Sequence, residues 1–190
     1  MRTVKKPEER KKEILTGALK VFSKKGYEKT TITDIAKELK ISQGLCYRYY
    51  TSKEEIYDEA LEEYSNHIVN SNTKRFNNDN RSLKEKIKNY SGYIKEYQNP
   101  ETDKELMYDL FHGQNSQKMH DQLIMKVASK LIPFIKKELQ KAKDKGEIKI
   151  TDIDTFTYFF IYGQVGVLLN NNSKNISTKI QNLLIEILEL

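Results

Sequence analysis

Residues 31–53 have the sequence TITDIAKELKISQGLCYRYYTSK, and this stretch decides the fold of the N-terminal part of the chain. It begins with a short amphipathic helix, whose apolar face consists of Ile35, Ala36 and Leu39. We expect Thr33 to cap this helix. A turn at 41–42 follows, and Ser42 is expected to cap a second helix over 43–49. The second helix is polar at its start and aromatic at its end, which favours a helix that enters a DNA groove.

The segment before this motif predicts a third helix, over 14–24. Its apolar side chains recur at helical spacing and form a stripe of Ile14, Leu15, Ala18, Leu19, Val21 and Phe22. Gly26 supplies the signal that ends this helix. Together the three helices predict a helix-turn-helix head.

The charge distribution agrees with a polyanionic partner for this head. Residues 1–55 hold 14 basic and 8 acidic side chains, whereas residues 56–190 hold 19 of each. The whole net charge of +6 therefore falls on the N-terminal part. A solvated basic tail is the alternative interpretation, but the position of the excess beside a helix-turn-helix favours attraction to phosphates.

Several runs within residues 10–60 carry a family resemblance. These runs are Lys25-Gly26-Tyr27, Thr30-Thr31-Ile32, Ile41-Ser42-Gln43-Gly44, Tyr47-Arg48-Tyr49-Tyr50 and Ser52-Lys53-Glu54. Their order resembles the N-terminal signature of the TetR family of transcriptional repressors. The resemblance implies a helix-turn-helix DNA-binding domain over 1–52. It also implies a helical ligand-binding and dimerisation domain over 53–190.

The composition favours an all-α fold for the whole chain. Among 190 residues there are only 8 Gly and 3 Pro and no Trp, while Lys, Glu, Leu and Ile are abundant. Periodicity and capping signals predict six helices after the head, over 52–76, 82–98, 102–113, 116–145, 152–169 and 176–188. The expected total is about nine helices.

The side chains proposed to bind DNA are those of the helix-turn-helix and of the start of the helix that follows it. They are Thr31, Thr33, Ser42, Gln43, Gly44, Leu45, Tyr47, Arg48, Tyr49 and Lys53. Gln43 suits adenine or a phosphate, and Arg48 suits a phosphate or guanine. Leu45 departs from the small hydroxyl residue usual in the family and suits a thymine methyl group. Core packing is the alternative for these apolar and aromatic residues, and we assign Tyr50 to it.

The last two predicted helices are strongly apolar and favour a homodimer built as a four-helix bundle. The proposed interface residues are Phe156, Phe160, Gly163, Val167, Ile176, Ile180, Leu184 and Ile187. The alternative is that these helices only complete the core of a monomer.

The resemblance also implies a cavity for an unidentified small-molecule effector. Aromatic and polar-tipped side chains are the candidates for its lining: Tyr90, Tyr93, Met107, Tyr108, Phe111, His112, Tyr158 and Tyr162. Core packing again competes with this interpretation for each residue.

The sequence contains no catalytic carboxylate pair, nucleophile elbow or glycine-rich phosphate loop. Cys46 is interpreted as a small buried hydrophobe rather than a redox switch. His112 and His120 are eight residues apart across a helix break, and His67 has no partner at a ligand spacing. We therefore expect no cofactor, no metal and no enzymatic activity.

These observations predict a ligand-responsive repressor that binds a palindromic DNA operator and is released by its effector. The alternatives are an activator, a regulator without an effector, a nonspecific architectural DNA-binding protein, or a helical protein whose basic head binds an acidic partner. The charged N-terminus does not resemble a secretory signal, and the apolar stretch 156–169 is too short for a membrane span of about 20 residues. We expect a cytoplasmic protein with no membrane partner.

Overall fold

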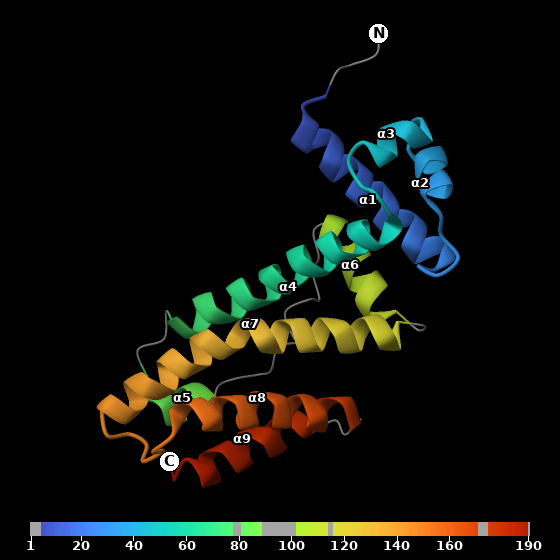
Figure 1. Cartoon of the computed structure of the whole chain (residues 1–190). Coiled ribbons are helices and arrows are strands. Elements are labelled where there is room, and N and C mark those ends of the chain that lie inside the picture. The colour runs from blue at the N-terminus through green and yellow to red at the C-terminus, as the bar shows by residue number, and fades with distance from the viewer. Residues whose placement is uncertain (1–4, 78–80, 89–101, 114–115, 171–174, 190) are drawn as a thin grey trace. The chain divides into compact units, whose positions relative to one another are not determined.

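The computed structural model describes residues 5–77, 81–88, 102–113, 116–170 and 175–189 (Figure 1). These residues form nine α-helices and no strand: α1 (Pro7–Lys25), α2 (Ile32–Glu38), α3 (Gln43–Tyr47), α4 (Lys53–Asn77), α5 (Leu83–Lys88), α6 (Thr102–His112), α7 (Gln117–Asp144), α8 (Ile153–Asn170) and α9 (Ile176–Ile187). The predicted all-α fold of about nine helices is confirmed. The helix predicted over 82–98 is described only as far as Lys88, and the rest lies outside the described residues.

The chain divides into two compact units. The first contains residues 1–64 and 99–120, and the second contains residues 65–98 and 121–190. The predicted DNA-binding domain, 1–52, lies within the first unit, which also holds the start of α4 and all of α6.

Local signals fix the helices of the head in the first unit. Pro7 occupies the first position of α1, where its missing N–H costs nothing. α1 ends at Gly26, whose φ of 84° suits a residue without a side chain. α2 is capped by Thr31 instead of Thr33, so the predicted cap was wrong by two residues. Both threonines suit a cap, but Asp34 stands three residues after Thr31 and completes a reciprocal capping box with it.

The core of the first unit draws on all of these helices. Its fully buried side chains include Ile14 and Leu19 of α1, Ile35 of α2, Cys46 of α3 and Ile56 of α4. Helices as short as α2 and α3 are unstable alone, so this packing holds them in place.

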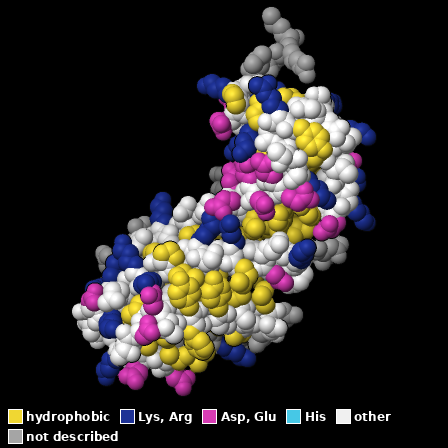
Figure 2. All heavy atoms as spheres, viewed as in Figure 1, with side chains coloured by type: hydrophobic (Ala, Val, Ile, Leu, Met, Phe, Trp, Pro, Cys, Tyr) yellow, Lys and Arg dark blue, Asp and Glu magenta, His cyan; other side chains and the backbone are white. Residues whose placement is uncertain are grey.

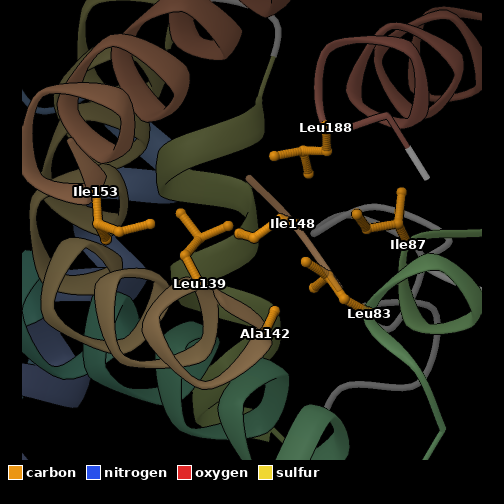
Figure 3. Packing of buried hydrophobic residues seen from close by; sticks show 7 residues of the cluster. All are labelled: Leu83, Ile87, Leu139, Ala142, Ile148, Ile153 and Leu188. Carbon is orange, nitrogen blue, oxygen red and sulfur yellow. The ribbon is translucent and has the colours of Figure 1, made fainter. Parts of the chain in front are cut away.

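The second unit has a core of its own (Figure 3). Side chains from α5, α7, α8 and the segments that flank α8 and α9 converge there: Leu83, Ile87, Leu139, Ala142, Ile148, Ile153 and Leu188. The side chain of Gln181 also donates a hydrogen bond to the carbonyl of Ile87, at 3.0 Å, and so joins α9 to α5. Within the described part of the chain, no helix combines the length and apolarity needed to cross a bilayer.

Candidate nucleic-acid interface

The second helix of the motif starts at a side-chain cap. The Ser42 hydroxyl accepts a hydrogen bond from the amide of Leu45 at 3.2 Å, as predicted. α3 ends at Tyr47, two residues earlier than expected. Beyond its end the backbone tightens, and the amides of Tyr49 and Tyr50 both donate to the carbonyl of Cys46, each at 3.0 Å.

α3 has one buried side and one exposed side. Cys46 and Tyr50 are fully buried, which confirms their assignment to the core. Burial also raises the pKa of the Cys46 thiol, which keeps it in the unreactive neutral form.

The exposed side of α3 carries four of the residues proposed to bind DNA. Gln43, Gly44, Tyr47 and Arg48 are exposed, and the Tyr47 ring is 48% accessible. Their spacing places them on adjoining positions of one helical face. No atom lies within 4 Å of the position that a Cβ of Gly44 would occupy, so packing does not require a glycine there. Leu45 and Tyr49 are half-buried at the edges of this face.

Thr31 and Thr33 are both exposed, but Thr31 also makes hydrogen bonds within the protein. The Thr31 hydroxyl donates to the carboxylate of Asp34 at 2.6 Å, and Lys25 contacts the same carboxylate at 2.6 Å. The Lys25 ammonium and the Thr31 hydroxyl and amide hold the pKa of Asp34 well below its usual range. Thr31 therefore has a structural role whether or not it also contacts DNA.

Lys53 is also engaged by the head. Its ammonium donates to the carbonyls of Tyr27 at 3.0 Å and Glu28 at 3.2 Å, and lies 4.5 Å from the centre of the Tyr27 ring. Burial, followed by the charge of Glu54, raises the pKa of Tyr27 to about 12. The start of α4 is thereby fastened to the loop between α1 and α2.

A second attachment joins α1 to α4. The Tyr50 hydroxyl donates to the carbonyl of Lys11 at 3.4 Å, and the Lys11 ammonium pairs with Glu59 at 2.7 Å. Burial raises the pKa of Tyr50 far above its usual value, and the negative charge of Glu59 raises it further. The hydroxyl therefore stays protonated and remains a donor. These contacts span tens of residues, and helical periodicity gives no signal for them.

Four of the proposed effector-binding residues lie together on α6, in the first unit. Met107 and Phe111 are buried, and the Phe111 ring lies 5.5 Å from that of Tyr64 and 5.8 Å from that of Tyr57. The His112 ring stacks on Tyr108 at 4.6 Å and lies 5.0 Å from the ring of His120. Burial, and to a smaller extent the charge of His120, lowers the pKa of His112 to about 4. The imidazole of His112 is therefore neutral at pH 7.

The other proposed effector-binding residues are elsewhere. Tyr158 and Tyr162 are exposed side chains of α8, in the second unit. Tyr90 and Tyr93 lie outside the described residues. Sequence reasoning missed the proximity of His120 to His112, because the break at Gly113 removes the helical spacing that would relate the two rings.

The second unit exposes apolar side chains on α8 and α9 (Figure 2). Among the side chains that the structure describes on these helices, the large exposed ones are Tyr158, Phe159, Tyr162, Val167, Leu183 and Ile187, and Phe159 is 74% accessible. We call these six residues the α8–α9 apolar face. Of the proposed interface residues, Gly163, Val167 and Ile187 are exposed, whereas Phe156, Phe160, Ile176, Ile180 and Leu184 are half-buried. Phe159 and Leu183 follow the apolar spacing of their helices, and both side chains are exposed.

Comparison with known proteins gives matches in the head and across the fold. Residues 14–60 match the family model of bacterial regulatory proteins of the tetR family. The regulator HbdR of Aromatoleum sp. (strain CIB) is 49% identical over 49 residues, which are 26% of this chain and 21% of HbdR. The negative regulator IcaR of the biofilm operon icaADBC of Staphylococcus epidermidis is 39% identical over 59 residues, which are 31% of this chain and 32% of IcaR. The match to these curated relatives therefore spans a fifth to a third of their length.

A solved structure extends the similarity to the whole fold. Salmonella enterica GusR is 16% identical and superimposes with a TM-score of 0.62 over 98% of this chain and 99% of GusR. The exposed α3 face on a basic three-helix head, followed by six more helices in the described part of the chain, defines a helix-turn-helix DNA-binding protein. The match at 14–60 assigns the head to the tetR family of bacterial regulatory proteins, and the curated relatives of the head together with the fold support a TetR-family regulator.

Proposed function

We propose that the protein is a transcriptional repressor that binds a palindromic operator as a homodimer and is released by a small-molecule effector. The observation that carries the proposal is the exposed polar face of α3, held by the Ser42 cap and the buried Cys46 and Tyr50. In this proposal Gln43 and Arg48 contact base edges or phosphates, while Tyr47 and Tyr49 contact phosphates. The net charge of the head attracts the duplex and therefore supports this role.

Two arguments support a homodimer. The α8–α9 apolar face exposes large aromatic and aliphatic side chains, which a second copy would remove from water. A helix of five residues also reads few base pairs, and two heads related by a twofold axis double the sequence that is read. The operator is then an inverted repeat. A DNA-binding protein shares a compartment with its DNA, so we place it in the cytoplasm.

Repression and effector release rest on more indirect support. The relative IcaR is named a negative regulator of its operon. We infer that the effector binds beside Phe111, His112 and Tyr108, which lie together on α6 and include one neutral imidazole. An effector bound there acts by binding one arrangement of the protein more tightly than another, since only differential affinity shifts such an equilibrium.

The test is selection of bound duplexes from a random pool by the purified protein at physiological salt. We expect enrichment of an inverted repeat, and a Gln43→Ala, Arg48→Ala double variant should lose that enrichment while keeping its helical content. Recovery of duplexes without enrichment would favour an architectural DNA-binding protein. No recovery would indicate an acidic protein partner for the head. Transcription in vitro from a promoter that carries the selected site then distinguishes repression from activation.

A further inference from the structure

Lys40 lies in the turn between α2 and α3 and has an unusual backbone conformation. Its φ is 54°, in the left-handed region that side chains disfavour. Two hydrogen bonds close the end of α2 around it, from the amide of Lys40 to the carbonyl of Lys37 at 3.1 Å and from the amide of Ile41 to the carbonyl of Ala36 at 3.0 Å. In this motif the left-handed residue is usually glycine.

The same chain shows the usual solution at the end of α7. There the amide of Gly146 bonds to Lys143 and the amide of Glu147 bonds to Ala142, each at 2.9 Å, and the φ of Gly146 is 74°. The two helix ends therefore have matching hydrogen bonds but different residues at the left-handed position. A glycine at position 40 would relieve strain, so the lysine needs another explanation.

The charge of Lys40 supplies that explanation. Its side chain is exposed, and within the described part of the chain its ammonium forms no ion pair or hydrogen bond. Two other lysines of the head are engaged in ion pairs, since Lys24 pairs with Glu38 at 3.3 Å and Lys25 pairs with Asp34. Among the described residues, the other non-glycine residue with a positive φ is Glu189, whose carboxylate lies 3.8 Å from the Lys149 ammonium.

The position of Lys40 gives its charge a target. Lys40 lies two residues before Ser42, the cap of α3. It is therefore close in sequence to the helix that, in the proposed function, contacts the bases. A flexible ammonium at the edge of a reading helix suits the phosphates that flank the groove. We propose that Lys40 is a phosphate-binding residue of the head, kept in a strained turn because its charge contributes to DNA affinity. This inference rests on the proposed function.

The test compares Lys40→Gly, Lys40→Asn and Lys40→Arg with the parent chain. The probe is a short fluorescein-labelled duplex of mixed sequence, titrated at several salt concentrations from about 50 to 200 mM. Thermal unfolding of each variant is measured in parallel. Gly146→Lys serves as a matched control, because it places a lysine in the same type of turn away from the head.

We expect Lys40→Gly to raise the melting temperature by about 2–4 °C and yet to weaken DNA binding about 3- to 10-fold. The slope of log affinity against log salt should fall by about one per protomer, and Lys40→Asn should lose affinity similarly. Lys40→Arg should bind as the parent does. Gly146→Lys should lower the melting temperature and leave the salt slope unchanged.

Two results overturn the proposal in distinguishable ways. If the parent binds the duplex and Lys40→Gly binds with the same affinity and salt slope, Lys40 has only a structural role and the inference alone fails. If the parent binds no duplex at any salt concentration, the inference fails together with the proposed function.

Discussion

Lys53 shows how one side chain fastens the head to the helix that follows it. Its ammonium makes two hydrogen bonds to carbonyls and lies over the Tyr27 ring. Each of these contacts involves a charged donor, and hydrogen bonds to charged groups are worth more than neutral ones. Lys53 therefore stabilises the fold, in addition to any attraction that its charge has for DNA.

Lys53→Ala should lower the free energy of unfolding by about 1–2 kcal/mol, because two carbonyls lose a charged donor. Urea unfolding followed by circular dichroism measures the change. Lys149→Ala is the control, since that lysine side chain is 88% exposed and its loss should change stability by less than about 0.5 kcal/mol. An unaltered midpoint for Lys53→Ala would mean that its contacts are not formed in solution.

His112 should make stability depend on pH. Its pKa is lowered from 6.5 to about 4 in the folded chain, so the unfolded chain binds a proton more readily between these values. The stabilisation is complete above about pH 6.5 and is lost as the pH falls towards 4. We expect a loss of about 1–2 kcal/mol from this residue, and His112→Asn should remove it.

At the scale of the element, α2 is a helix of seven residues that depends on its cap and its packing. The capping box and the hydrogen bonds around Lys40 satisfy backbone groups at its two ends. α3 is shorter still and is held by Ser42 at one end and the burial of Tyr50 at the other.

The two threonines of α2 offer a direct comparison. Thr31→Ala should destabilise the protein by about 1 kcal/mol because it removes the cap, whereas Thr33→Ala should have an effect below about 0.5 kcal/mol. Thermal unfolding of the two variants separates them. Equal effects would contradict the assignment of the cap to Thr31.

Patterns between nearby residues explain why much of the fold was predictable. Spacing of apolar residues located the helices, and the Ser42 cap and the burial of Cys46 and Tyr50 follow from residues within one or two turns. The contacts of Lys53 with Tyr27 and of His112 with His120 depend on chain segments brought together by folding. Periodicity carries no such information, so these contacts were not predicted.

At the scale of the whole molecule, the α8–α9 apolar face is the surface that we propose a second copy of the chain covers. Leu183 is 52% exposed, whereas its neighbour Leu184 packs against the core of the second unit. A charge at Leu184 would therefore disturb the fold as well as an interface. The exposed residue gives the cleaner test of the proposed homodimer.

Leu183→Glu should weaken dimerisation by roughly 2 kcal/mol or more per protomer, because it buries a charge in an apolar interface. Sedimentation velocity should then show a monomer with the helical content of the parent. Leu184→Glu should lose both association and thermal stability. A dimer that survives Leu183→Glu would move the interface away from this part of α9.

The single thiol of the sequence is enclosed in the head, since Cys46 is fully buried beneath the face of α3. A thiol reagent reaches it only when the head opens locally, so the rate of labelling reports how often that happens. A duplex bound to α3 favours the closed head and slows the labelling. The labelling rate of Cys46 thus reports the local opening of the DNA-binding head, and no engineered cysteine is needed.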